Sequence, residues 1–167
     1  LALGGITYGV SDLELTAAYA AIADGGQYRK PVFYTKVTDS KGNVLIDNTE
    51  NKATQVFKAS TASLLTNAME DVLEKGTGVA ARLDNMHAAG KTGTTNEAKD
   101  LVFAGFTPYY TAAIWATYDT HAEFPESDRE FHKRLWAKVM NEIHEGLADM
   151  DFETSATVQE ATICTKT

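Results

Sequence analysis

The sequence has a single cysteine, three prolines and fewer basic than acidic residues. The lone Cys164 excludes an internal disulfide framework. No run of about 18 apolar residues occurs, which predicts that no helix of this segment crosses a membrane. The 15 lysines and arginines are outnumbered by 23 aspartates and glutamates, so the net charge is −8, and the basic residues do not cluster. Nucleic acid is therefore excluded as a partner, because its recognition needs concentrated positive charge.

The histidines do not indicate a metal site. The four are His87, His121, His132 and His144, and none has the i, i+4 spacing or the cysteine pairing typical of zinc ligands. Each is interpreted as an ordinary surface or core residue. We predict neither a metal nor a cofactor.

Apolar residues make up 44% of the 167 positions, enough for a packed core in one domain or a large piece of one. The chain begins at Leu1 without an initiator methionine or the basic flank of a signal peptide. It ends in the β-prone run Thr162–Thr167. Both ends are therefore expected to be cut from a longer chain.

Local signals predict a helix and then a hairpin in the first third of the chain. Ser11 precedes two acidic residues and an apolar pattern, which is typical of an N-capped helix, and Gly25 and Gly26 end it. The runs Val32–Val37 and Val44–Ile46 flank a loop with Gly42, as in a solvent-edged β-hairpin.

The middle of the chain predicts one helix followed by three strands. A 3.6-residue apolar period runs from Ser60 to Gly76. The glycine- and threonine-rich segment His87–Thr95 favours extended structure, and two β-prone runs follow at Leu101–Phe106 and Tyr110–Tyr118. Short links between consecutive strands favour an antiparallel meander.

A last helix is expected from Ser127 to His144. Its sheet-covering face is predicted to consist of Phe131, Leu135, Val139, Met140 and Ile143. The acidic and then threonine-rich residues beyond Gly146 are interpreted as a tail or linker. The predicted fold class is α+β, an antiparallel sheet packed with helices.

One dense group of residues could carry chemistry, and it lies in Gly90–Thr95. In an extended strand the Thr92 and Thr94 side chains share one face, and Gly93 between them leaves the backbone open to a ligand. Lys91 adds a positive charge suited to a carboxylate or a developing oxyanion. The alternative is a threonine-rich edge strand with a solvated lysine.

A phosphate-binding loop is a second alternative, because Gly90-Lys91-Thr92 matches the end of G-x-x-x-x-G-K-[ST]. The position that requires the first glycine is Asn85, however, and the residues after Thr95 lead into a strand. Such a loop should place its phosphate at a helix N-terminus. The nucleotide reading is therefore the weaker one.

Several segments together resemble the C-terminal half of the transpeptidase domain of class A penicillin-binding proteins. They are Leu3–Ser11, Ala17–Ala20, Gly25–Tyr28, Lys30-Pro31, Lys75–Ala80, Ala89–Asn96, Lys99-Asp100, Phe103–Pro108 and Trp115, in the family's order and spacing. The resemblance covers Leu1 to Asp119, and residues 120–167 match more loosely. It implies a partial penicillin-binding or β-lactamase-like transpeptidase fold, with residues 1–145 in the domain and 146–167 as a tail or the start of a linker.

The resemblance implies a D,D-transpeptidase that cross-links peptidoglycan stem peptides ending in D-Ala-D-Ala and is acylated by β-lactams. It implies an extracytoplasmic location, with membrane attachment through a segment this chain lacks. The family uses S-x-x-K, [SY]-x-N and K-[ST]-G. No serine here begins either of the first two, so the chain alone is expected to be inactive.

The resemblance also implies a role for each matching residue. Lys91 would hold the charge and hydrogen-bond network around the absent S-x-N serine, and the Thr92 and Thr94 hydroxyls would bind the substrate carboxylate beside Gly93. The Thr94 amide would be one oxyanion donor. Val102 departs from the aromatic residue often found at its position. A non-catalytic module that binds cell-wall peptides stays open as an alternative.

Overall fold

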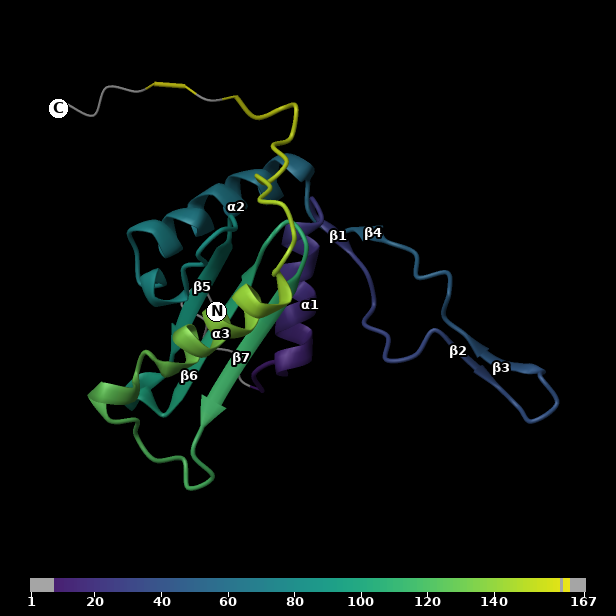
Figure 1. The fold of residues 1–167 in the computed structure, drawn as a ribbon, viewed down its shortest axis with the longest axis horizontal. Helices are drawn as coiled ribbons and strands as arrows, with labels where there is room; N and C mark the ends of the chain where they lie inside the picture. The colour runs from purple at the N-terminus through teal and green to yellow at the C-terminus, as the bar shows by residue number, and fades with distance from the viewer. Residues whose placement is uncertain (1–7, 160, 163–167) are drawn as a thin grey trace.

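The computed structural model describes residues 8–159 and 161–162 and is built around an antiparallel sheet (Figure 1). The sheet contains β5 (Ala89–Thr94), β6 (Asp100–Phe106) and β7 (Thr111–Thr117), in the order β5-β6-β7. Helices pack against it, which confirms the predicted α+β class and the meander. None of the helices in the described ranges is long and apolar enough to span a bilayer.

Helices cover both faces of this sheet. Phe103 packs edge to face on Trp136 of α3 (Phe131–Ile143), with ring centroids 5.0 Å apart. Phe106 packs on Tyr19 of α1 (Asp12–Ala23) at 6.5 Å. Positions 103 and 106 differ by an odd number along one strand, so their side chains lie on opposite faces. The sheet is therefore the middle layer between α1 and α3, and α2 (Ala59–Glu74) packs beside β5.

Helix α1 begins and ends where the sequence predicts. The Glu14 amide donates to Ser11 Oγ at 3.2 Å, and the Ser11 amide donates to the Glu14 carboxylate at 2.8 Å. This reciprocal capping satisfies two amides that have no partner within the helix. Gly25 and Gly26 follow with φ of +60° and +89°, a conformation that favours glycine and turns the chain away.

The predicted hairpin is present but shorter than expected. It pairs β2 (Lys36–Thr38) with β3 (Val44–Asp47), while residues 32–35 lie outside the strand. A second pair, β1 (Gln27–Tyr28) with β4 (Thr54–Gln55), joins the two ends of the segment that carries this hairpin. The hairpin projects away from the sheet (Figure 1), and all four residues of β3 are exposed.

Helix α2 matches its prediction and ends in a tight glycine-flanked loop. Its buried face consists of Ala62, Thr66, Met69 and Leu73. A Cβ on Gly76 would lie 2.8 Å from the Val72 Cα, and one on Gly78 would lie 3.0 Å from a Val72 side-chain carbon. The loop between α2 and the short helix η1 (Val79–Ala81) therefore wraps closely around the helix end.

Helix α3 corrects the sequence prediction in two ways. It begins at Phe131 rather than Ser127, because Glu126–Asp128 forms a separate short helix, η3. Of the predicted sheet-covering face, only Met140 is buried, whereas Phe131, Leu135, Val139 and Ile143 are 39–47% exposed. The buried residues are His132, Lys133, Trp136, Ala137 and Met140. The large Trp136 ring packs on the sheet, and the polar residues His132 and Lys133 on the same face hide this row from an apolar pattern.

Part of the segment beyond Gly146 returns to the domain. Phe152 lies edge to face against Phe106, with centroids 5.4 Å apart, and the Ser155 amide donates to Ser63 Oγ at 2.9 Å. The boundary after residue 145 stays a prediction. The β-prone run at 162–167 lies outside the described residues except for Thr162, as do the first seven residues.

Candidate active site

The predicted site residues Lys91, Thr92, Gly93 and Thr94 all lie in β5. Within the described residues β5 has β6 as its only sheet neighbour, so its other side is an open edge. Its direct partners on β6 run from Ala104, opposite Lys91, to Leu101, opposite Thr94. The extended structure predicted for this segment is therefore present, and the strand lies at an edge of the sheet.

The backbone of this edge strand points toward the open side at two threonines. The Thr95 amide donates to the Asp100 carbonyl at 3.1 Å, which makes this a hydrogen-bonded pair in the β5–β6 ladder. Such pairs alternate in an antiparallel ladder, so the peptide groups of Thr92 and Thr94 point away from β6. The Thr94 amide is thus directed toward the open edge of β5.

Lys91 and Thr92 contact each other directly. The Lys91 ammonium donates to the Thr92 carbonyl at 3.1 Å and to Thr92 Oγ1 at 3.2 Å. Thr94 lies two positions farther along the same strand face as Thr92, with its side chain exposed. The structure brings a cation, a hydroxyl and an outward amide together within four residues.

The two glycines of this strand differ in what surrounds them. A Cβ on Gly90 would lie 2.8 Å from both the Ala104 carbonyl oxygen and the Phe103 ring. A Cβ on Gly93 would meet only Val102, at an ordinary contact distance of 3.4 Å. Packing within this chain therefore requires glycine at position 90 but not at 93. A ligand lying against the backbone would explain glycine at 93.

The sequence assigned no role to two residues that adjoin this strand. Thr77 Oγ1 lies 2.9 Å from Thr92 Oγ1. The buried Lys133 of α3 donates to the Thr77 carbonyl at 3.0 Å and pairs with Glu130. The motif Lys75-Gly76-Thr77-Gly78 could have indicated Thr77, because glycines on both sides of it indicate a tightly held loop. Lys133 had no comparable signal.

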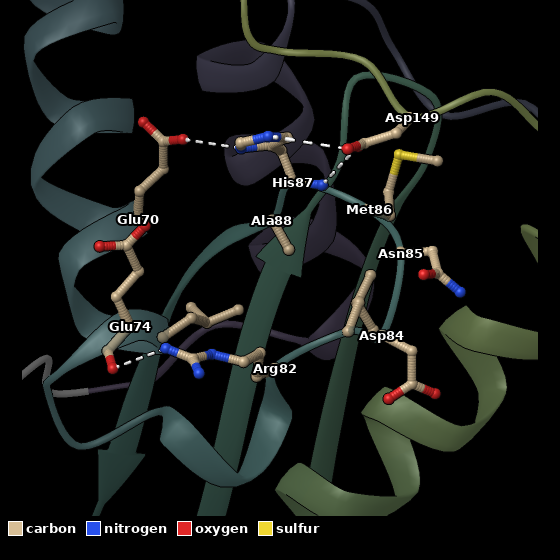
Figure 2. A pocket seen from close by; sticks show the side chains of 11 residues that line it. Glu70, Glu74, Arg82, Asp84, Asn85, Met86, His87, Ala88 and Asp149 are labelled. Atoms are coloured by element: carbon tan, nitrogen blue, oxygen red, sulfur yellow. Dashed lines mark hydrogen bonds and ion pairs between the residues drawn. The ribbon is translucent and has the colours of Figure 1, made fainter.

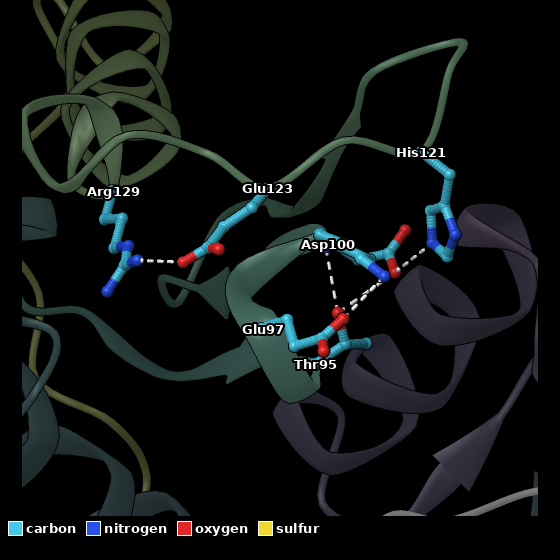
Figure 3. A network of polar contacts seen from close by, with 7 residues as sticks. Thr95, Glu97, Asp100, His121, Glu123 and Arg129 are labelled. Carbon is cyan, nitrogen blue, oxygen red and sulfur yellow. Dashed lines mark hydrogen bonds and ion pairs between the residues drawn. The ribbon is translucent and has the colours of Figure 1, made fainter.

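A polar network holds the turn that follows Thr94 (Figure 3). Asp100 accepts hydrogen bonds from Trp115 Nε1 and Thr95 Oγ1, both at 3.1 Å, and lies 3.2 Å from His121 Nε2. Burial alone would raise the pKa of Asp100, but these hydrogen bonds outweigh it and lower the pKa. The turn itself has positive φ at Glu97, +62°.

A separate pocket of about 400 Å³ lies between α2 and the segment that leads into β5 (Figure 2). His87 lies between Glu70, 3.8 Å from Nδ1, and Asp151, 2.9 Å from Nε2. Burial raises the pKa of Glu70, although His87 opposes the shift. The pocket lies where the C-terminal segment meets α2. Lys91 and Thr92 do not line it.

The nucleotide-binding alternative does not fit this geometry. Gly90-Lys91-Thr92 lies inside β5, and a short turn, η2 (Asn96–Ala98), connects it to β6. The described residues contain no helix that starts directly after this motif, as a phosphate loop requires.

An α+β sheet with a lysine, two threonines and an outward amide on its open edge is what we expect of the penicillin-binding or β-lactamase-like class of fold that the sequence resembles. Family comparison gives the particular member of that class. The model of the penicillin binding protein transpeptidase domain matches residues 1–144, so the chain belongs to this family.

Several curated relatives support this membership. Penicillin-binding protein 1A of Clostridium perfringens is 34% identical over 161 residues, which are 96% of this chain and 19% of the relative. Penicillin-binding protein 4 of Bacillus subtilis is 41% identical over 119 residues, 71% of this chain and 19% of the relative. The chain thus spans about a fifth of the length of these relatives.

Solved structures show the same fold. The PonA1 protein of Mycobacterium tuberculosis in complex with penicillin V is 27% identical, with a TM-score of 0.73, over 83% of this chain and 39% of that one. Penicillin-binding protein 1A of Haemophilus influenzae, at 17% identity, matches with a TM-score of 0.73 over 86% of this chain and 28% of its own, which bears on the fold alone. The predicted partial transpeptidase fold is confirmed.

Proposed function

We propose that this chain supplies the carboxylate-binding and oxyanion-stabilising edge of a peptidoglycan D,D-transpeptidase. The serine nucleophile and its base would come from S-x-x-K and S-x-N motifs outside this chain. The parent protein would cross-link stem peptides ending in D-Ala-D-Ala and would be acylated by β-lactams. Family membership supports the reaction class, and the relative crystallised with penicillin V supports the ligand class.

The proposed reaction is an acyl transfer. The serine oxygen attacks the carbonyl carbon of the D-Ala-D-Ala bond, the C–O bond forms, the C–N bond breaks, and the departing amine takes up the serine proton. In a β-lactam the same C–N bond belongs to the ring, so the leaving amine stays attached. In the reaction with the peptide substrate, the amine of a second stem peptide would then accept the acyl group from the serine and release the serine.

Each site residue has a role in this scheme. The Thr94 amide would stabilise the oxyanion of the tetrahedral intermediate, since it points to the open edge of β5. Lys91 would support proton transfer around the S-x-N serine through its charge. The Thr92 and Thr94 hydroxyls would hold the substrate carboxylate, with Gly93 keeping the backbone accessible.

The observation that carries the proposal is the contact of Lys91 with Thr92, 3.2 Å from Nζ to Oγ1, on an edge whose Thr94 amide points outward. Lys91 is exposed, and its ammonium nevertheless converges on the hydroxyl and the carbonyl of Thr92. We further infer that the site works on the extracytoplasmic side of the bacterial membrane, with attachment through a segment outside this chain.

Intact-mass spectrometry with penicillin V tests the proposal. The isolated chain should form no covalent adduct that survives denaturation, because it has no activated serine. The longer protein that carries this segment should gain one penicillin mass. An adduct on the isolated chain would contradict the assignment of an external nucleophile. An unmodified longer protein would instead favour a non-catalytic peptide-binding module.

A further inference from the structure

We propose that Thr77, which lies outside the K-T-G strand, makes the site selective for anionic ligands by directing the Thr92 hydroxyl proton toward them. Lys133 is the positioning residue that holds Thr77 in place. The inference rests on the proposed function, because it gives a direction to a hydroxyl assigned to the carboxylate site.

The Thr77 loop has little freedom to move away from Thr92. Gly76 and Gly78 lie so close to Val72 that neither tolerates a Cβ without displacement. The hydroxyl oxygens of Thr77 and Thr92 are 2.9 Å apart, a normal hydrogen-bond length. Thr77 is itself exposed, so no packing requirement explains a hydroxyl-bearing side chain there.

The hydrogen inventory of Thr92 explains how Thr77 acts. A threonine hydroxyl has one proton to donate and two lone pairs to accept with. The Lys91 ammonium already donates to Thr92 Oγ1 at 3.2 Å. When Thr77 also donates, both lone pairs are occupied and the Thr92 proton must point elsewhere. When Thr92 donates to Thr77 instead, it has no proton left for a ligand.

An ionised carboxylate selects the first arrangement. It accepts hydrogen bonds and donates none, so Thr92 can bond to it only when the Thr92 proton points outward. Thr77 then donates to Thr92, and the two hydroxyls form a relay that ends on the anion. Charge-assisted hydrogen bonds are about twice as strong as neutral ones, so the relay favours an acid over its ester.

Lys133 stabilises the loop that carries this relay. Its side chain is 8% exposed, and its ammonium donates to the Thr77 carbonyl at 3.0 Å. Glu130 on the same helix compensates the charge. A buried lysine is costly unless paired, and this one crosses from α3 to a loop next to the substrate edge. Lys133 contacts neither Thr92 nor Lys91 in this arrangement and so acts through Thr77.

The test compares acylation of the complete transpeptidase by penicillin V and by its methyl ester. The readout is the second-order acylation rate constant for the acid divided by that for the ester. This ratio does not depend on the fraction of protein that is active. Thr77→Val should lower this ratio by about 3- to 10-fold, the equivalent of one net hydrogen bond. Thr77→Ser should keep the ratio near the wild-type value.

Matched variants separate positioning from general damage. Lys133→Met should lower the ratio in the same direction as Thr77→Val. Val79→Ala, an exposed change beside the loop, should not alter it.

Four outcomes would overturn the inference or a part of it. An unchanged ratio in Thr77→Val would assign Thr77 to loop structure alone. An unchanged ratio in Lys133→Met would remove Lys133 from the relay. A wild-type enzyme that is acylated equally by acid and ester would remove the relay itself, whereas a wild-type enzyme that is not acylated by either would defeat the proposed function as well.

Discussion

Thr92 and Phe103 are direct cross-strand partners, so a proposed substrate-binding residue lies on the same sheet face as a fully buried ring. Phe103 in turn contacts Trp136 on α3. The Thr92 hydroxyl therefore sits at the rim of the main hydrophobic core, and changes in that core should reach the site.

The orientation of α3 gives a prediction about this core. Met140→Ala should cost about 2–5 kcal/mol of unfolding free energy, because Met140 has no exposed surface. Val139→Ala, at a position 45% exposed, should cost less than about 1 kcal/mol. Urea unfolding of both variants measures the difference. Equal losses would contradict the orientation of α3 described above.

The two glycines of β5 should respond in opposite ways. Gly90→Ala should destabilise the fold, since its Cβ would overlap the Ala104 carbonyl and the Phe103 ring. Gly93→Ala should leave the thermal midpoint nearly unchanged but slow β-lactam acylation in the complete domain, because the methyl group enters ligand space. A Gly93→Ala enzyme that is acylated at the normal rate would show that this face stays free of ligand.

Lys91→Ala should reduce acylation far more than initial binding. In the proposed function the charge of Lys91 acts where negative charge and proton movement develop, and removing one such group costs on the order of 100-fold, about 3 kcal/mol. Stopped-flow measurement with a penicillin separates the acylation rate constant from the initial dissociation constant. Acylation at the wild-type rate would reduce Lys91 to a structural residue on an edge strand.

The two threonines should show a different pattern from Lys91. Thr92→Val deletes a hydroxyl that, in the proposed function, contacts a carboxylate already present before reaction, so it should mainly weaken binding. Thr94→Val keeps the backbone amide and should retain the oxyanion contribution while losing that of the hydroxyl. The same stopped-flow assay distinguishes them, and a large loss of acylation rate with unchanged binding in Thr92→Val would contradict its role.

Asp100 should make stability depend on acid pH. Hydrogen bonds lower its pKa in the folded state despite burial, so its contribution is present above the unfolded pKa of about 3.9. That contribution is lost as the pH falls through the lower folded value. Asp100→Asn should therefore be less stable than the wild type at pH 7, with a gap that narrows below about pH 4. A gap that stays constant from neutral to acid pH would contradict this assignment.

Local signals predicted most of the fold, whereas tertiary contacts had to supply the rest. Ser11 and the glycines at 25 and 26 encode the ends of α1 in adjacent residues, and β5 follows from its own composition. The face of α3 could not be chosen, because the buried row through Trp136 also contains the polar residues His132 and Lys133, whereas the exposed row through Leu135 is apolar.

The site, like the fold, has one part that the sequence shows directly and one part that depends on tertiary packing. The strand residues from Lys91 to Thr94 are contiguous and could be found as a motif. The Thr77 hydroxyl reaches Thr92 across 15 positions, and Lys133 reaches Thr77 across 56, so these contacts depend on how α2 and α3 pack.

The Lys91 ammonium on the Thr92 carbonyl also bears on how the open edge of β5 avoids unwanted association. Unpaired edge strands offer their carbonyls and amides to any extended chain that approaches. Here the outward carbonyl of Thr92 is already occupied by a cation 3.1 Å away. A chain that pairs with β5 must displace that cation from its acceptor. The occupied carbonyl therefore leaves one fewer free acceptor on this edge for an approaching strand.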